Sequence, residues 1–309
     1  MTAPDYATLI DAATWDFIRQ TNSFYPPDAI GLSLQEQRAV YDRMTAAFLH
    51  PYPPGVTATD QDLGGVPVRV YAGSRATVMY LHGGGFVVGG LHSHDDICAE
   101  ICAATGYRVV SVDYRLAPEH LHPAAYDDAL AATRAAASYG APLVMVGDSA
   151  GGSLAASVSH ALRGSAVTVL GQVLIYAGLG GDPDTGSYIT HADAPMLTRA
   201  DVIYYQDIRH GGAPPEADPT AAALQDTDFT GLPPTVAISA ECDPLADDGR
   251  HYRDRVLAAG GQAVWVNEAG LVHGYLHARH SVPRAQASFR RICRVIAILG
   301  RGDPLPVDL

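Results

Sequence analysis

The segment Gly147–Gly151, which has the sequence G-D-S-A-G, constrains the fold of this chain more than any other stretch. It joins a short apolar run, Val144–Val146, which predicts a buried strand, to an Ala- and Ser-rich run that predicts a helix. Where a strand turns sharply into a helix, side chains two residues either side of the tip would collide, and glycine relieves the collision. Gly147 and Gly151 stand at those two positions around Ser149. We therefore expect the Ser149 hydroxyl to project from the tip of a tight turn.

The residue after this serine strengthens the interpretation. Ala150 begins the predicted helix, where unpaired N–H groups and the helix dipole favour negative charge. A strand, a serine at a sharp turn and a helix together are typical of a nucleophile elbow. The alternative is a glycine-rich turn that merely contains a serine, so the interpretation needs partners elsewhere in the chain.

Composition narrows the classes of function. The chain has 309 residues, 48% of them hydrophobic and 17% charged, which suits a single α/β domain over 1–309. Its net charge of −13 argues against nucleic acid and anionic membranes as partners. All 20 basic residues are arginine. The lack of lysine excludes a Schiff-base lysine, a P-loop lysine and an S-x-x-K acyl-enzyme.

Cysteine usage and hydropathy indicate the compartment. The four cysteines show neither a disulfide framework nor zinc-ribbon spacing, and we expect buried free thiols. The N-terminus lacks a basic and then apolar signal segment, and no apolar run approaches the roughly 18 residues of a membrane span. We therefore expect a cytoplasmic protein without membrane insertion. The sequence leaves a homodimer open.

The order of elements predicts an α/β fold with a mostly parallel central sheet and helices on both faces. Two amphipathic helices, over 5–20 and after the capping box Ser33–Glu36, precede every predicted strand, so we expect them on top of the sheet. A Gly/Pro-rich excursion over 178–215 is expected to lie there too. Strands are predicted at 66–71, 77–81, 108–112, 143–146, 167–176, 235–240 and 263–266, and helices at 124–137, 198–208, 247–259 and 283–299.

A second glycine-rich loop, His82–Phe86, follows the strand predicted at 77–81. A phosphate-binding loop is the competing interpretation, but no Lys-Ser/Thr pair follows, and Val88 occupies the place of the third glycine of G-x-G-x-x-G. Consecutive glycines instead let backbone amides approach a reacting oxygen. We expect the N–H groups of Gly83, Gly84 and Ala150 to form an oxyanion hole.

A nucleophilic serine also needs a base and an orienting acid, which should follow later strands. Asp243 follows the strand predicted at 235–240, and His273 follows the last predicted strand. The order Ser149, Asp243, His273 is the one expected of α/β hydrolases. Asp247 and Asp248 compete with Asp243, but as first-turn residues of the next helix they would offset its dipole. The histidines that compete with His273 are His251, His277 and His280.

The segment His92–Asp96 resembles a metal site, because it places two histidines beside two carboxylates. It also opens a predicted helix, where Ser93 or Asp95 would serve as a cap. No second ligand cluster is evident in the sequence. We therefore expect no metal and no cofactor.

Five motifs, taken in order, resemble the bacterial hormone-sensitive-lipase family of carboxylesterases (family IV), in the subgroup with aspartate before the nucleophile. They are His82–Gly85, Tyr114–His120, Gly147–Gly152, Asp243–Leu245 and His273–Gly274. The resemblance implies an α/β-hydrolase fold, a Ser149–Asp243–His273 triad and an ester as the small-molecule substrate. It also implies a helical cap, built from about 1–55 and the insertion at about 178–215. The triad alone leaves open amides, lactones or carbamates as substrates, and a non-catalytic receptor on the same fold.

The apolar residues of the two cap segments are candidates for the substrate pocket. Bulky side chains there would leave little room for a long acyl chain, so we expect activity on short- to medium-chain esters. The alternative is that these residues only pack the cap against itself. The candidates are Phe17, Met44, Phe48, Met196, Leu197, Tyr204 and Tyr205.

Overall fold

The computed structural model describes residues 4–26 and 31–306. The strands are β1 (Ala58–Leu63), β2 (Val66–Tyr71), β3 (Thr77–Leu81), β4 (Arg108–Val112), β5 (Leu143–Asp148), β6 (Val169–Ile175), β7 (Thr235–Cys242) and β8 (Ala263–Val272). The α-helices are α1 (Tyr6–Leu9), α2 (Ala12–Asn22), α3 (Leu34–Ala46), α4 (Asp95–Thr105), α5 (Ala124–Ala136), α6 (Ala150–Ala161), α7 (Gly186–Thr190), α8 (Arg199–His210), α9 (Ala246–Ala258) and α10 (Pro283–Gly300). No helix in these two stretches is both long and apolar enough to cross a membrane.

The strands form one mixed sheet in the order β1-β2-β4-β3-β5-β6-β7-β8. The pairs β1–β2 and β2–β4 are antiparallel, and every later pair is parallel. Strand β3 lies at the centre, with Val78 opposite Val109 on one side and Val144 on the other. The expected mostly parallel sheet with helices on both faces is therefore confirmed.

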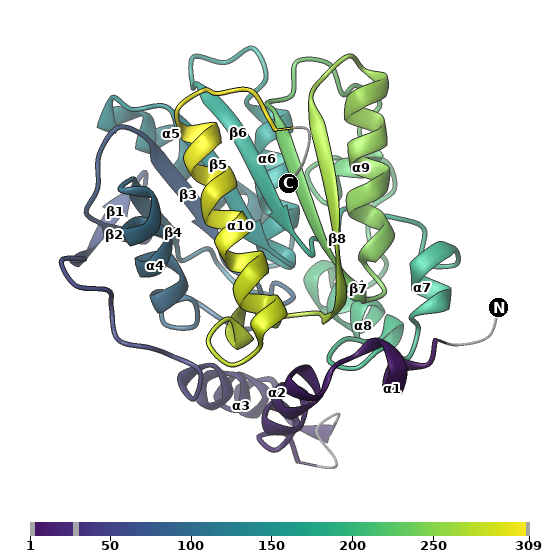
Figure 1. Ribbon diagram of the computed structural model, residues 1–309. Helices are drawn as coiled ribbons and strands as arrows, with labels where there is room; N and C mark the ends of the chain where they lie inside the picture. Colours follow the sequence, from purple (N-terminus) through teal and green to yellow (C-terminus); the bar gives the residue numbers. More distant parts are fainter. Residues whose placement is uncertain (1–3, 27–30, 307–309) are drawn as a thin grey trace.

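Both faces of the sheet are buried, which explains why its central strands are continuous apolar runs. In β3, Val78 and Tyr80 point into a core with α4 and α10, whereas Met79 and Leu81 point into a core with α5, α6 and α9. Figure 1 shows α4 and α10 in front of the sheet, with α5 and α6 behind it. The carboxyl ends of the parallel strands are thus held between two helical layers.

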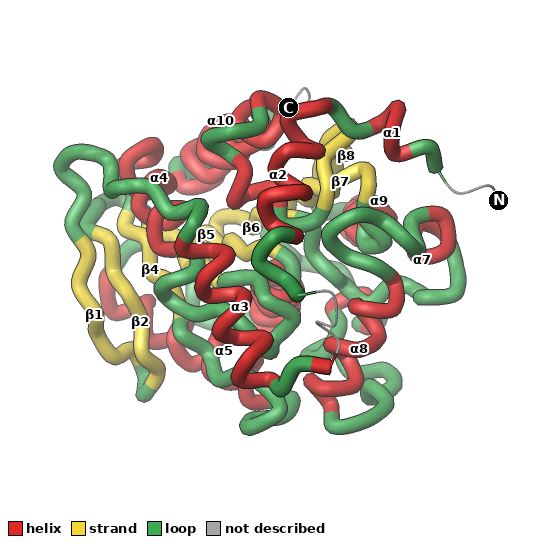
Figure 2. Tube along the Cα trace, turned by 90° about the horizontal axis from the view of Figure 1, so that it is seen from below, coloured by secondary structure: helices red, strands yellow, loops and turns green. Residues whose placement is uncertain are grey.

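The N-terminal helices and α8 lie together at one end of the sheet (Figure 2). There the loop after β3 is packed between them. Its residues Val87 and Val88 lie in one cluster with Leu34 and Tyr41 of α3 and with Tyr205 of α8. The Arg38 side chain of α3 also donates to the Val87 carbonyl oxygen at 2.8 Å. Segments far apart in the sequence therefore meet over the loop that follows the central strand.

The N-terminal boundaries differ in one respect from those predicted. The helix expected over 5–20 is interrupted, because the Asp11 side chain accepts the Thr14 N–H at 2.8 Å and caps a new helix, α2. The capping box predicted at Ser33 is present, with the Glu36 carboxylate accepting the Ser33 N–H at 2.8 Å.

Candidate active site

The turn between β5 and α6 has the strained geometry that its glycines predict. Ser149 has φ 52° and ψ −121°, a conformation that side-chain-bearing residues rarely adopt. A Cβ on Gly147 would lie 2.3 Å from the Gly151 carbonyl oxygen, and a Cβ on Gly151 would lie 1.9 Å from the Leu81 carbonyl oxygen. Neither position can hold a larger residue without moving the backbone, so the two glycines allow the serine to stand at the tip.

Ser149, His273 and Asp243 meet at the carboxyl end of the sheet. The Ser149 Oγ lies 2.8 Å from His273 Nε2, and His273 Nδ1 lies 2.7 Å from Asp243 Oδ2. Since a carboxylate can only accept, Nδ1 carries the proton and Nε2 is left to accept from the serine hydroxyl. The Asp243 side chain is fully buried, and its Oδ1 accepts the Leu245 N–H at 2.9 Å. This arrangement can withdraw a proton from Ser149 and hold the imidazole in one orientation.

The competing acids and histidines lie elsewhere. Asp247 and Asp248 occupy the first turn of α9, as expected. Asp247 accepts from the Ser187 N–H and from Arg250, whereas Asp248 accepts the N–H groups of the loop before α7. The three remaining histidines do not contact Ser149. His277 is buried, His280 pairs with Glu100, and His251 lies beside Arg250.

Asp148, the residue before the nucleophile, is the centre of a buried polar network. Its carboxylate accepts from the Tyr80 hydroxyl at 2.8 Å, the Gly83 N–H at 3.0 Å and His94 Nε2 at 3.3 Å. Burial opposes ionisation, but His94 and these hydrogen bonds hold the pKa of Asp148 well below its usual range. The acid thus ties the loop after β3 to the nucleophile turn.

This network corrects one predicted oxyanion donor. Because the Gly83 N–H already donates to Asp148, it is not free to bind a reacting oxygen. In the described part of the chain, the backbone N–H groups of the next two residues, Gly84 and Gly85, donate to no backbone carbonyl oxygen. Ala150 N–H is the first of α6 and has no acceptor within its own helix. The free amides beside the serine are therefore those of Gly84, Gly85 and Ala150.

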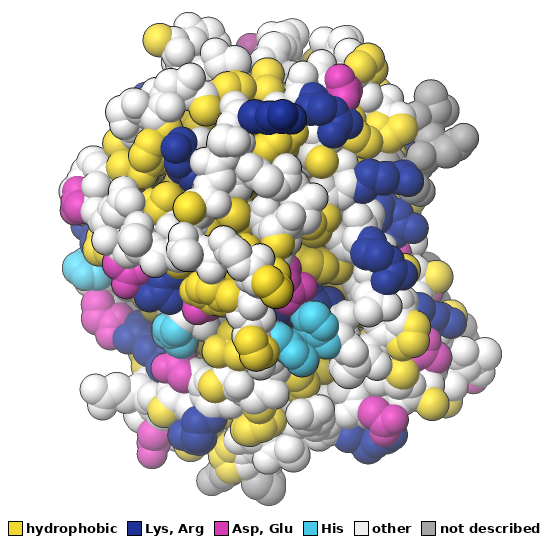
Figure 3. All heavy atoms as spheres, turned by 60° about the vertical axis from the view of Figure 1, so that its left-hand side comes forward, with side chains coloured by type: hydrophobic (Ala, Val, Ile, Leu, Met, Phe, Trp, Pro, Cys, Tyr) yellow, Lys and Arg dark blue, Asp and Glu magenta, His cyan; other side chains and the backbone are white. Residues whose placement is uncertain are grey.

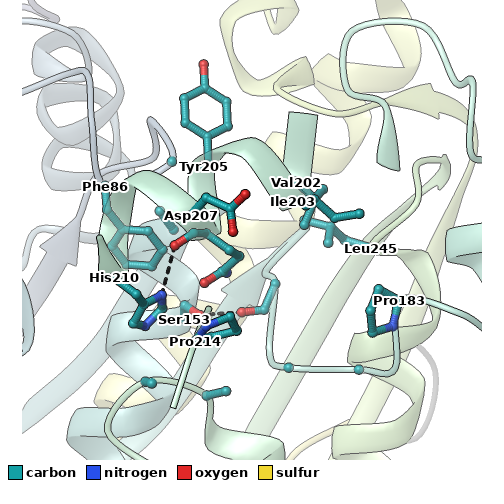
Figure 4. A pocket seen from close by; sticks show the side chains of 18 of the residues that line it. Phe86, Ser153, Pro183, Val202, Ile203, Tyr205, Asp207, His210, Pro214 and Leu245 are labelled. Atoms are coloured by element: carbon teal, nitrogen blue, oxygen red, sulfur yellow. Dashed lines mark hydrogen bonds between the residues drawn. The ribbon is translucent and has the colours of Figure 1, made fainter. Parts of the chain in front are cut away.

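A cavity of about 410 Å³ opens beside Ser149 and Ala150. One wall is the excursion between β6 and β7, and the other is the loop after β3. Figure 4 looks into this cavity and shows Val202 and Ile203 of α8 beside Leu245, with Phe86 on the opposite side. Side chains that line it and that the sequence did not single out include Phe86, Tyr188, Val202, Ile203 and Leu245. Tyr188, Val202 and Ile203 lie in the 178–215 excursion, Phe86 directly follows a motif and Leu245 ends one, and none of these places is specific for a pocket residue.

Of the seven predicted pocket residues, only Leu197 and Tyr205 line this cavity. The three N-terminal residues instead belong to the main hydrophobic core, where the Phe17 and Phe48 rings lie 5.2 Å apart and Met44 is buried in the same cluster. Met196 also packs against that core. Tyr204 is 40% exposed, and its hydroxyl oxygen accepts a hydrogen bond from Gln37 Nε2 at 3.1 Å. These five residues therefore do not line the cavity, because an amphipathic pattern marks burial and not what is buried against it.

The segment His92–Asp96 has no arrangement suited to a metal. His94 Nδ1 lies 2.8 Å from the Ser93 hydroxyl, and Asp95 accepts from the Tyr52 and Tyr71 hydroxyls. Within residues 4–26 and 31–306, no group of three His, Cys, Asp or Glu side chains is placed to hold a metal ion. Ser93 does not cap α4; its hydroxyl accepts the Gly90 N–H instead.

Comparison with known proteins places this geometry in context. The family model for the alpha/beta hydrolase fold matches residues 78–277. The chain is 39% identical to the carboxylesterase NlhH of Mycobacterium tuberculosis over 240 residues, 71% of this chain and 74% of that protein. It is 33% identical over 239 residues to the ethyl acetate hydrolase of Pseudomonas putida, covering 72% of this chain and 74% of that protein.

A solved structure is similar over almost its whole length. It is an esterase from the bacterial hormone-sensitive lipase family, with a TM-score of 0.84 at 27% identity, and the match covers 93% of this chain and 98% of that one.

Proposed function

This chain belongs to the alpha/beta hydrolase fold family, in its hormone-sensitive-lipase branch of carboxylic ester hydrolases, and on that premise we propose that it is a serine esterase acting on short- to medium-chain acyl esters. The observation that carries this proposal is the continuous hydrogen-bonded path from Ser149 through His273 to Asp243. Its end at the serine opens into a largely apolar cavity.

The reaction proceeds in two steps. His273 Nε2 takes the Ser149 proton while Oγ bonds to the ester carbonyl carbon, and the carbonyl electron pair moves to its oxygen. The amides of Gly84, Gly85 and Ala150 donate to that oxyanion. The imidazolium then gives its proton to the leaving alcohol, and the acyl group stays on Ser149. Water, deprotonated by His273, releases the acid and restores the serine.

The helices before β1 and the excursion over about 178–215 form the cap of this proposed enzyme. Two hydrogen bonds between the segments support it: Tyr6 hydroxyl to His191 Nδ1 at 3.0 Å, and Gln37 Nε2 to Tyr204 hydroxyl at 3.1 Å. The cavity lies between the second segment and the nucleophile turn. The cap would therefore limit the size of the bound acyl or alcohol group.

Site-directed variants and a labelled fluorophosphonate test the proposed triad. Ser149→Ala is expected to lower kcat for p-nitrophenyl acetate by about 10⁶-fold, and Asp243→Asn by about 10⁴-fold. Wild type should carry the label on Ser149, and the alanine variant should carry none. Asp247→Asn is the matched control, because its carboxylate contacts Arg250 and not His273.

The outcomes separate the alternatives. Labelling at another residue, or a larger loss in Asp247→Asn than in Asp243→Asn, would reject these assignments. Saturable binding of an ester without turnover would favour a receptor. Faster turnover of a matched anilide, lactone or carbamate than of the ester would identify a different acyl substrate for the same serine.

A further inference from the structure

Arg209, at the end of α8, is a buried cation without a buried anion beside it. The residue is 2% exposed, and within the described residues it forms no direct ion pair; the acid that acts on it, Asp218, pairs with His122 at 3.2 Å. Its guanidinium donates to the Ala221 carbonyl oxygen at 2.9 Å and to His122 Nδ1 at 3.3 Å. Burial lowers the pKa of Arg209 to about 9. Burying a charge without a direct ion pair opposes folding, so the position of Arg209 calls for an explanation.

The guanidinium lies against the loop that would hold the oxyanion. Its carbon is 3.7 Å from the centre of the Phe86 ring, which is close contact between a cation and an aromatic face. Phe86 directly follows Gly85 and lines the cavity beside Ser149. Its φ of 66° is strained for a residue with a side chain, so the surrounding contacts must hold it there. Besides the Arg209 guanidinium, the Ala117 N–H holds Phe86, since it donates to the Phe86 carbonyl oxygen at 2.9 Å.

A second residue of α8 contacts the same loop. Tyr205 lies one turn before Arg209, on the same side of the helix. A Cβ on Gly85 would lie 2.7 Å from the Tyr205 ring, so the ring packs directly on the glycine backbone. Helix α8 therefore covers two successive residues of the loop, Gly85 with Tyr205 and Phe86 with Arg209. Figure 4 shows Tyr205 and Phe86 from α8 and the loop at the edge of the cavity.

We propose that Arg209 is a positioning residue that fixes the oxyanion loop from the cap and places a positive charge behind it. This inference rests on the proposed function. The stacked guanidinium holds Phe86, and with it the Gly84 and Gly85 amides, in the orientation that meets the oxyanion. Because Arg209 is buried and little screened by water, its charge also favours the negative oxygen of the tetrahedral intermediate over the neutral ester. The cap then contributes to the rate of the chemical step as well as to substrate size.

Arg209→Met tests the proposal, since it keeps a long side chain and removes the charge. We expect kcat for p-nitrophenyl acetate to fall by about 10- to 100-fold with KM changed less than threefold, a smaller loss than the roughly 10²- to 10³-fold of a direct oxyanion donor. Arg209→Lys keeps the charge over the ring. Where Arg209→Met loses more than tenfold in kcat, the kcat of Arg209→Lys should be at least tenfold higher than that of Arg209→Met. Arg255→Met is the matched control, because Arg255 lies over the Phe229 ring of another part of the fold.

Inhibitor binding distinguishes positioning of the oxyanion from simple packing. A trifluoromethyl ketone accepts Ser149 Oγ at its carbonyl carbon and becomes an oxyanion, whereas the corresponding secondary alcohol fills the cavity without forming one. In Arg209→Met the inhibition constant of the ketone should rise by the same factor by which kcat/KM falls, and that of the alcohol should not change. Equal weakening of both inhibitors, or unchanged kcat, would overturn the inference.

Two further measurements distinguish a failure of this inference from an unfolded variant and from a failure of the proposed function. Circular dichroism and the melting temperature of each variant show whether it has folded. If Arg209→Met is unfolded, Arg209→Lys is compared with wild type instead. A folded Arg209→Lys variant that binds the ketone and the alcohol more weakly by the same factor rejects the proposal. Absence of Ser149-dependent hydrolysis in wild type would reject the proposed function itself. Wild-type hydrolysis that persists undiminished in Arg209→Met rejects only the role of Arg209.

Discussion

Asp248 is a fully buried carboxyl group that anchors the loop along one wall of the cavity. Its Oδ2 accepts the N–H groups of Leu179 at 2.6 Å, Gly180 at 3.1 Å and Gly181 at 3.3 Å, while its Oδ1 has no partner in the described residues. Burial outweighs these bonds and raises the pKa of Asp248 from 3.8 to about 6. In the unfolded chain the group keeps its ordinary value.

This shift predicts how stability depends on pH. Because the folded pKa is above the unfolded one, the folded state binds the proton more tightly, and the cost of ionised Asp248 is fully present above pH 6. It is relieved as the pH falls from about 7 towards 4. Urea unfolding of wild type and Asp248→Asn at pH 7 and pH 4.5 should show the stability of wild type improving relative to the variant by about 2 kcal/mol on acidification.

The comparison with Asp248→Asn removes the contributions of other titrating groups, which are common to both proteins. An asparagine can still accept the three N–H groups through its carbonyl oxygen, and it has no charge to lose. If wild type gains no stability relative to Asp248→Asn between pH 7 and pH 4.5, or loses some, the pKa of Asp248 is not raised by burial as its surroundings indicate.

Individual residues were predictable where spacing alone determines chemistry. The G-x-S-x-G spacing and the order of the later strands were enough to predict that Ser149, Asp243 and His273 would lie together, and hydrogen bonds join them in the structure. The choice of Gly83 over Gly85 was wrong because consecutive glycines do not reveal which N–H is already used. That depends on Asp148, whose carboxylate reaches Gly83 from a neighbouring strand.

Elements with strong apolar patterns were predicted closely, and polar ones were not. Strand β1, Ala58–Leu63, was missed because four of its six residues are exposed and polar, and only pairing with β2 makes it a strand. Strand β8 was expected to end at Val266, but it continues to Val272 because β7 pairs with it beyond a register shift. Helix α7, with five residues, is held by contacts to α9 and was read as loop.

At the level of elements, α8 and the segment before it should set the acyl-chain preference. The cavity volume of about 410 Å³ is near the low end for ligand sites, and Leu197, Val202 and Tyr205 form part of its wall. For p-nitrophenyl esters we expect kcat/KM to be highest for acyl chains of about two to six carbons and at least tenfold lower at about twelve, because longer chains exceed a cavity of this size.

Leu197→Ala should widen this wall and move the optimum towards longer chains. Leu257→Ala serves as the control, because Leu257 is 47% exposed on α9 and does not line the cavity. An optimum at twelve or more carbons in wild type, or activity that rises sharply at a lipid interface, would contradict a cap that limits chain length.

The whole molecule carries 33 acidic residues against 20 arginines. Many arginines pair with carboxylates, including Arg38 with Glu119 and Arg69 with Asp60 and Asp95. Figure 3 shows acidic side chains dispersed over one face, several beside arginines, without a large acidic patch. On this face the excess of negative charge therefore acts as weak, dispersed repulsion.

Such repulsion predicts a limited response to salt. The net charge of −13 destabilises the compact state through self-repulsion, and salt screens it once the Debye length falls to about 10 Å near 0.1 M. Salt screens the surface ion pairs as well, which reduces the gain. We expect the melting temperature to rise by about 2 °C, which is roughly 1 kcal/mol for a chain of this size, between 10 mM and about 0.15 M NaCl and then to level off. Differential scanning calorimetry at pH 7.5 measures both parts of the curve. A melting temperature that keeps climbing into molar salt, or a protein that unfolds in dilute buffer, would mean that close acidic repulsion and not this diffuse charge dominates the surface.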